Sequence, residues 1–201
     1  MFHTLPARHK EDRMVRIAEE KELPRVNELR AQVNALHATG RPDIFRPGFG
    51  ADLQAYAHTL WENENSDVLV ALRDGVICGF ACVEYVRKPE TAYGLARAYY
   101  HVAEFGVDLP YRRQGAATEL VVYMKQDAAA RGFSRIELDV WALTRMHWRF
   151  TRRRGLKLTA GIWNCSFSPC RQGNAAGIAA DARKKHAAAI KFSEKVSFFE
   201  K

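Results

Sequence analysis

The sequence predicts an α/β domain in which helices pack in layers against a central sheet. Apolar residues recur with helical spacing in three segments and with strand spacing in five, in the order strand, helix, helix, three strands, helix, strand. An Asp-Gly pair between two of the strand-like segments indicates a β-hairpin. With 201 residues, of which 47% are hydrophobic and 27% charged, the chain is long and apolar enough to form a buried core.

The first third of the chain is expected to form one strand and two helices. Met14–Ala18 reads as a short strand. A helix then begins near Pro24, which suits a first helical turn, and ends at Gly40. Residues 41–50 contain two prolines and two glycines and predict a loop, after which Ala51–Trp61 forms the second helix. The apolar stripe of the first helix consists of Leu23, Val26, Leu29, Val33 and Leu36.

Two strands are expected on either side of the Asp-Gly turn, over Asp67–Arg73 and Val76–Val86. The second strand contains Cys78 and Cys82, whose spacing of four places both on one face of the strand. Packed thiols and zinc ligands are the two interpretations of this pair. We favour packing, and expect no metal site, because no further Cys or His lies near them in the sequence.

The next segments complete the predicted core. Ala98–Asp108 is a strand, residues 115–131 form a helix that Gly132 ends, and Arg135–Val140 alternates as a strand. The apolar stripe of this helix consists of Ala117, Leu120, Val121, Met124 and Ala128.

Several classes of protein are excluded by composition. The chain contains no run of about eighteen apolar residues, which is the length that a membrane-spanning helix needs. Residues 1–13 form a polar leader that lacks the apolar stretch of a signal peptide; we expect it to be disordered, with Met14 as an alternative start. Four cysteines are too few for a disulfide framework, so a cytoplasmic protein is expected.

The segment from Glu104 to Leu120, EFGVDLPYRRQGAATEL, carries the strongest functional signal. A strand ends at Asp108, a turn follows, and the small residues 115–117 begin a helix. Small residues let a ligand approach the backbone, and the N–H groups of a first helical turn bind anions. Because Arg112 and Arg113 add charged donors, we favour a pyrophosphate site; an ordinary strand–turn–helix with two solvated arginines is the alternative.

On this segment the chain resembles the GNAT superfamily of N-acetyltransferases. Residues 112–117, Arg-Arg-Gln-Gly-Ala-Ala, match the family signature Gln/Arg-x-x-Gly-x-Gly/Ala, and the elements predicted from Met14 to Trp141 follow the family's order. The resemblance implies a mixed, largely antiparallel central sheet flanked by helices, and acetyl-CoA as co-substrate. It assigns the pantetheine of acetyl-CoA to Phe105, Gly106 and Val107, and the pyrophosphate to Arg112, Arg113, Gln114, Gly115, Ala116 and Ala117, with Thr118 beside them.

Acetyl transfer to an amine needs a base that accepts a proton, directly or through water. Glu104 is the best candidate for this base and Asp108 a weaker one; a solvated or ion-paired strand residue is the alternative for Glu104. The resemblance also places the acceptor pocket at the loop between the first two helices. His37, Arg41 and Asp43 are candidates for contacting the acceptor there, with ordinary loop solvation as the alternative.

The net charge of +8 divides the chain at about residue 142. Residues 1–142 contain 18 of the 31 basic and 20 of the 23 acidic side chains, which leaves 13 basic and 3 acidic ones for residues 143–201. We therefore expect an acetyltransferase core over residues 14–142 and a basic, poorly ordered tail. The basic clusters at 152–154 and 183–186 lack an aromatic platform, so nucleic acid is not expected as a partner.

The tail also departs from the family pattern. Thr144 stands where the family has Asn, and Thr151 where it has the Tyr that protonates the departing thiolate. When each codon is read one base earlier, Met146 followed by His147 must give Ala, and Asn and Tyr become allowed at positions 144 and 151. We hypothesise that the residues after Ala142 are translated out of frame, so that the last helix and strands are replaced.

Sequencing the gene across the codons for Val140 to Ser166 tests this hypothesis. We expect to find one additional base near codons 142–143, which restores the family's Asn and Tyr. A gene that agrees with the printed chain would contradict the hypothesis and establish a genuine, divergent tail.

The sequence thus predicts an acetyl-CoA-dependent N-acetyltransferase that acts directly on a primary amine of a small molecule or peptide. We expect this chain to be impaired in catalysis, because Thr151 replaces the Tyr that serves the family as the general acid. The alternatives are a non-catalytic acyl-CoA binder and a module that binds nucleic acid through the basic tail. GNAT proteins often dimerise, so the resemblance agrees with a homodimer. No membrane partner is expected.

Overall fold

The computed structural model describes residues 12–139, 157–159 and 162–166. Every element predicted up to residue 139 forms, with ends that differ by at most two residues. The helices are α1 (Leu23–Gly40), α2 (Ala51–Glu62) and α3 (Ala116–Ala130), with single 3-10 turns η1 (Glu20–Glu22) and η2 (Leu109–Tyr111). The strands are β1 (Arg13–Ile17), β2 (Ser66–Arg73), β3 (Val76–Lys88), β4 (Arg97–Val107), β5 (Arg135–Asp139), β6 (Lys157–Thr159) and β7 (Ile162–Ser166).

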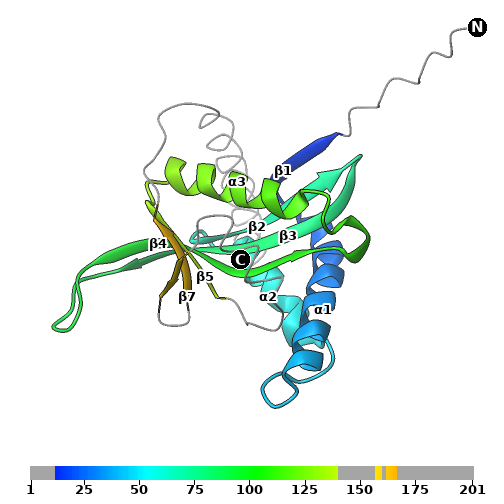
Figure 1. The fold of residues 1–201 in the computed structure, drawn as a ribbon, viewed down its shortest axis with the longest axis horizontal. Helices are drawn as coiled ribbons and strands as arrows, with labels where there is room; N and C mark the ends of the chain where they lie inside the picture. The colour runs from blue at the N-terminus through cyan, green and yellow to red at the C-terminus, as the bar shows by residue number, and fades with distance from the viewer. Residues whose placement is uncertain (1–11, 140–156, 160–161, 167–201) are drawn as a thin grey trace, which may run out of the picture.

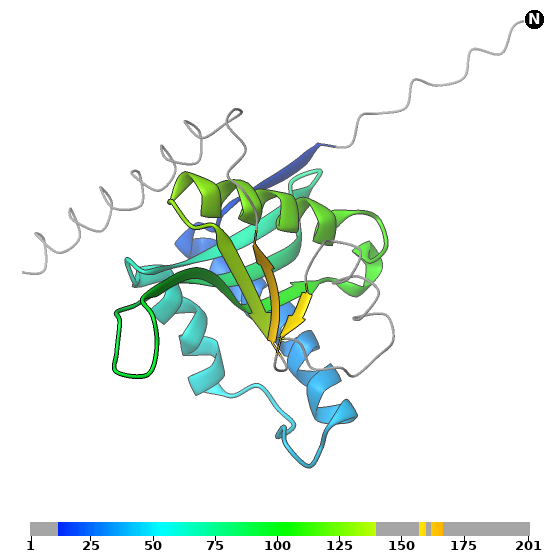
Figure 2. The same ribbon diagram turned by 60° about the vertical axis from the view of Figure 1, so that its left-hand side comes forward.

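The described strands form one sheet of seven strands in the order β1-β2-β3-β4-β5-β7-β6. Neighbouring strands are antiparallel except for the parallel pair β4 and β5. Helix α3 covers one face of the sheet, and α1 and α2 cover the other (Figures 1 and 2). The predicted mixed, largely antiparallel sheet flanked by helices is confirmed.

Each face of the sheet has its own hydrophobic core. On the α3 side, Leu120 and Met124 pack with the buried Tyr100 of β4. On the other side, Leu29 of α1 packs with Phe80 of β3. These cores follow from the helical stripes seen in the sequence, because the apolar stripe of an amphipathic helix packs against the sheet.

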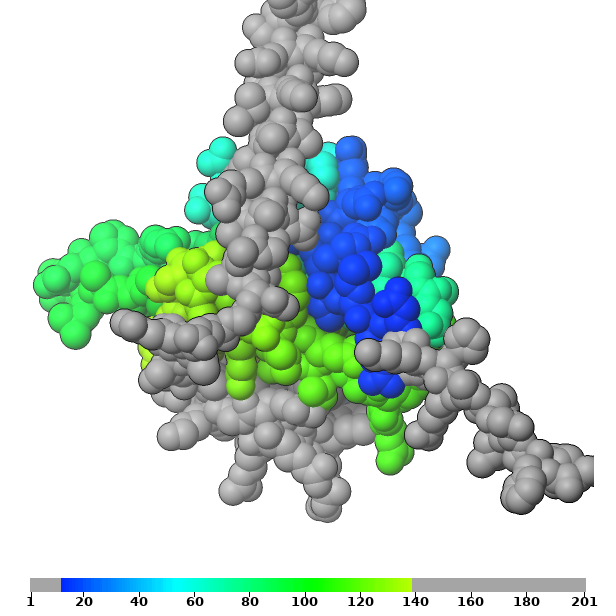
Figure 3. All heavy atoms as spheres, turned by 90° about the horizontal axis from the view of Figure 1, so that it is seen from above, coloured from blue at the N-terminus to red at the C-terminus, as the bar shows by residue number. Residues whose placement is uncertain are grey.

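The predicted Asp-Gly hairpin joins β2 to β3. Asp74 and Gly75 both have positive φ, 48° and 76°, which is the backbone conformation of a two-residue turn that matches the twist of the strands. Strands β3 and β4 extend beyond their neighbours as a two-stranded arm that projects from the body (Figures 1 and 3).

The prediction that Cys78 and Cys82 share one face of their strand is wrong. Ala71 pairs with Gly79 and Leu72 with Ile77, so Cys78 is the additional residue of a β-bulge. The bulge reverses the alternation, and Cys78 packs in the α3-side core whereas Cys82 packs in the core under α1 and α2. Both thiols are fully buried and packed, as favoured from the sequence.

The described part of the tail adds two strands to the sheet that the sequence did not predict. Residues 162–166 pair antiparallel with β5, and residues 157–159 pair with them in turn. The outer edge of β5 would otherwise expose a row of backbone donors and acceptors, and the Ile-Trp start of the segment favours a strand. Residues 1–11, Thr144, Thr151 and the basic clusters lie outside the described residues.

Among the described helices, none combines the length and hydropathy needed to cross a membrane.

Candidate active site

Strands β4 and β5 separate in the middle of the sheet. β4 pairs with β3 along its whole length, from Arg97 to Val107, but with β5 only from Tyr100 to Val102. Beyond Val102 the described part of β5 no longer pairs with β4. Among the described strands, none pairs with β4 on its β5 side after Val102, although this position is in the middle of the sheet.

A β-bulge lies where the two strands separate. Val83 pairs with Val102 and Cys82 with Glu104, so Ala103 is the additional residue. After the bulge, Glu104 faces α1, whereas Phe105 and Val107 pack against the α3-side core.

The backbone after the bulge is oriented by strand pairing. The Asp108 N–H donates to the Cys78 carbonyl of β3, 2.9 Å away. Because backbone groups alternate in direction along a strand, those of Phe105 and Val107 point to the side away from β3. The Val107 carbonyl there accepts a hydrogen bond from Arg112 Nε, at 3.0 Å.

The turn after β4 leads into the N-terminus of α3. Gly115 has a φ of 102° and precedes the first helical residue, and Arg113 also has a positive φ of 65°. The Thr118 and Glu119 N–H groups donate to the Gly115 carbonyl, at 2.8 and 3.0 Å. The N–H groups of Ala116 and Ala117 precede them in the first turn, where a helix offers no acceptor of its own. Such a terminus favours an anion.

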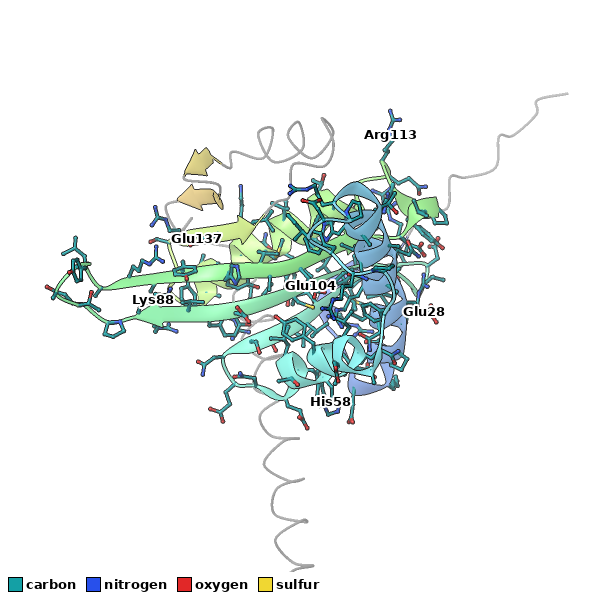
Figure 4. All side chains as sticks on the ribbon, turned by 90° about the horizontal axis from the view of Figure 1, so that it is seen from below. Glu28, His58, Lys88, Glu104, Arg113 and Glu137 are labelled. Atoms are coloured by element: carbon teal, nitrogen blue, oxygen red, sulfur yellow. The ribbon has the colours of Figure 1, made fainter. Side chains whose placement is uncertain are left out.

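The structure brings most of the predicted pyrophosphate residues together. Arg112 is held against the end of β4, and Gln114 Nε2 donates to the Pro110 carbonyl at 2.7 Å. The exposed Arg113 side chain extends away from the body of the molecule (Figure 4). Arg73, which sequence reasoning missed, supports the loop by donating to the Gln114 carbonyl at 2.6 Å with its side chain only 4% exposed. Its position at the end of a buried strand gave no specific signal.

Glu104 is held in a bidentate ion pair with Arg30 of α1. Arg30 Nε and Nη2 lie 2.6 and 2.9 Å from the two carboxylate oxygens. Burial disfavours the charged guanidinium, but the Glu104 carboxylate outweighs this effect, and the Arg30 pKa is raised. The ion-paired interpretation of Glu104 thus describes its resting state, while 30% of its side chain stays exposed.

Sequence reasoning also missed Arg30. The residue follows Val26 by four positions and precedes Val33 by three, so it lies on the apolar stripe of α1. A charged residue on a core-facing stripe was the signal that could have found it.

Asp108, the weaker candidate base, is engaged at the end of β4. Gln32 Nε2 donates to one carboxylate oxygen at 2.9 Å and Arg25 Nη2 to the other. Burial would raise the Asp108 pKa, but the hydrogen bonds from Gln32 and Arg25 prevail and lower it. Two α1 arginines therefore hold the carboxylates that bracket residues 105–107.

The three candidate acceptor contacts lie at the far end of α1 and in the following loop. The His37 ring stacks on Phe45 with a centroid distance of 5.0 Å. Arg41 and the exposed Asp43 form a bidentate pair with each other, at 2.8 and 2.7 Å. The structure thus brings Arg41 and Asp43 together.

A model of the acetyltransferase (GNAT) family matches residues 16–156. The chain belongs to the GNAT acetyltransferase family. The match includes the separated strands, the turn and the helix N-terminus described above. The search of curated proteins found no match to this chain.

Solved structures of similar fold include GNAT enzymes. A mutant of the BH1408 protein from Bacillus halodurans is 22% identical with a TM-score of 0.69, over 73% of this chain and 94% of that one. The aminoglycoside N-acetyltransferase AAC(6')-Iy in complex with CoA is 17% identical with a TM-score of 0.62, over 83% and 99%. An N-acetyltransferase from Staphylococcus aureus is 17% identical with a TM-score of 0.59, over 78% and 99%. At these identities the likeness establishes the fold.

Replacing Gly115 by alanine tests whether the α3 N-terminus binds the co-substrate. A side chain at this φ costs about 1–2 kcal/mol of backbone strain, which the loop relieves by moving the first-turn amides. We expect the acetyl-CoA affinity, measured by titration calorimetry, to fall about tenfold.

Gly132→Ala is the matched control, because Gly132 has a φ of 80° at the opposite end of α3 and open space around it. It should cost similar stability and leave the affinity unchanged. Equal affinities for the two variants would contradict the assignment.

Proposed function

We propose that the chain is an acetyl-CoA-dependent N-acetyltransferase that transfers the acetyl group directly to a primary amine. The observation that carries the proposal is the separation of β4 from β5 after Val102, next to the amide-bearing N-terminus of α3. An edge of extended backbone suits an amide-containing chain such as pantetheine, and a helix N-terminus suits its pyrophosphate.

The co-substrate would lie along two consecutive segments. Phe105, Gly106 and Val107 would bind the pantetheine through the backbone of β4, and residues 112–117, with Thr118, would bind the pyrophosphate. Gly106 also lets α1 approach the strand, since a Cβ there would lie 2.7 Å from both Phe80 and Val33. The site is thus shaped by the packing of α1 as well as by the signature residues.

Glu104 is the proposed proton acceptor. The amine nitrogen attacks the thioester carbonyl, the C–N bond forms, the C–S bond breaks and coenzyme A leaves as the thiolate. The nitrogen gives up a proton, which Glu104 accepts directly or through water. The partial exposure of Glu104 on the α1 side of the sheet supports this role (Figure 4).

We propose a small-molecule amine as the acceptor. The structure of AAC(6')-Iy in complex with the bisubstrate analogue CoA-S-monomethyl-acetylneamine, 17% identical with a TM-score of 0.60, shows a fold of this kind holding an amine linked to CoA. His37, Arg41 and Asp43 remain proposed acceptor contacts, and the cytoplasm the proposed location.

A non-catalytic acyl-CoA binder is the second candidate. The observation that favours it is the bidentate Arg30 pair, because both carboxylate oxygens of Glu104 already accept hydrogen bonds from the guanidinium. The two candidates differ in turnover and not in binding.

Measuring coenzyme A release against a panel of primary amines separates these candidates. We expect release with the wild-type chain and a loss of about 100-fold in kcat for Glu104→Gln, since a positioned base contributes at least that factor. Acetyl-CoA affinity should not change.

The control is Glu28→Gln, which removes an exposed glutamate paired with Arg25 on the outside of α1. It should retain wild-type turnover. Binding without release by the wild type would establish the acyl-CoA binder, and full turnover by Glu104→Gln would remove Glu104 from the mechanism.

A further inference from the structure

Arg30 is a buried guanidinium at the centre of the α1–α2 side of the sheet. Only 1% of its side chain is exposed. A buried charge of this kind persists only when it is paired and hydrogen-bonded. Its partners therefore reveal which parts of the fold it holds together.

The partners come from three different elements. Nε and Nη2 donate to the Glu104 carboxylate of β4, at 2.6 and 2.9 Å. Nη1 donates to Asn27 Oδ1 of α1 at 2.8 Å and to the Leu53 carbonyl in the first turn of α2. A single planar group thus connects β4, α1 and α2.

Two aromatic rings enclose the same guanidinium. Its central carbon lies 5.2 Å from the Phe49 ring centroid and 5.3 Å from that of Tyr56. Phe49 belongs to the loop before α2, and Tyr56 to α2 itself. Together with the bond to Leu53, these contacts join Arg30 to three points of the segment 49–56.

The other end of this connection is the point where acetyl transfer is proposed. Glu104 directly follows the Ala103 bulge, just beyond the last residue pair between β4 and β5. We propose that Arg30 is a positioning residue for acetyl transfer: it orients the Glu104 carboxylate at the strand separation and fixes residues 49–56 on the same face. This inference rests on the proposed function.

Lysine cannot replace arginine in this role. A guanidinium offers five donors in a fixed fork, and Arg30 directs four hydrogen bonds to acceptors that lie in different directions. An ammonium keeps the charge but loses the bidentate geometry. Arg30→Lys therefore separates positioning from charge.

Arg30→Lys is tested with Arg16→Lys as the matched control. Arg16 forms an equally bidentate pair with Glu22, at 2.7 Å for both bonds, at the β1 edge of the sheet. We expect Arg30→Lys to lower kcat with the amine about tenfold or more while the acetyl-CoA Kd stays within about threefold. Arg16→Lys should lower the melting temperature comparably and keep the wild-type kcat. Equal kcat values for the two variants would overturn the proposal.

A double mutant distinguishes positioning from a loss of stability. In Arg30→Met/Glu104→Gln both charges are absent, so no buried charge is left unpaired. If Arg30 acts through Glu104, the double mutant has the kcat of Glu104→Gln alone. A double mutant whose kcat falls by the product of the two single effects would show that Arg30 does not act through Glu104.

If the wild-type chain releases no coenzyme A, the proposed function fails. Amide hydrogen exchange then still tests whether Arg30 positions Glu104 and residues 49–56. The free Arg30→Lys chain should then exchange faster than wild type at residues 49–56 and 104–107 together, with the Asp74–Gly75 turn unchanged. Unaltered exchange in either segment would overturn the positioning role.

Discussion

The bidentate pair between Arg30 and Glu104 is the constraint on which the candidate site depends. Burying a guanidinium costs several kcal/mol unless its donors are satisfied, and this fold satisfies them with acceptors from β4, α1 and α2. The pair therefore forms only when both helices and the strand are in place. It ties helices α1 and α2 to β4, which loses its pairing with β5 in the middle of the sheet. A second pair, between Arg25 and Asp108, repeats the connection at the end of that strand.

Two β-bulges determine which side chains of the sheet face helices α1 and α2. Before the bulge at Ala103, the even-numbered residues Tyr100 and Val102 face the α3-side core. After it, the even-numbered Glu104 faces α1 instead. If Ala103 were instead an ordinary paired residue of the strand, simple alternation would have directed the Glu104 carboxylate into the apolar core under α3. The same device at Cys78 separates two cysteines that simple alternation places on one face.

Much of the fold could be predicted from the sequence because local patterns determine it. The helical stripe of α3 and the Asp74–Gly75 turn each depend on residues close together in the chain. The bulges could not be predicted, because an additional residue in a strand is defined only by its partner strand. The final strands were missed because their pairing depends on the open edge of β5, which no local pattern reveals.

The candidate site was likewise only partly predictable. The residues of the turn before α3 were found because small residues and arginines are consecutive there. Arg30 was missed because its partner lies 74 positions away, in a strand that the sequence does not align with α1. The sequence left Glu104 open as a base or as a solvated or ion-paired strand residue, and the structure supplies its partner, the buried Arg30.

Amide hydrogen exchange with and without saturating coenzyme A tests the central claim most directly. The account predicts that coenzyme A slows exchange at residues 105–107 of β4 and 115–117 at the start of α3. The Asp74–Gly75 turn and the projecting β3–β4 arm should exchange at unchanged rates. Unchanged exchange at both site segments would contradict the claim that the separated strands and the α3 N-terminus together form the acetyl-CoA site.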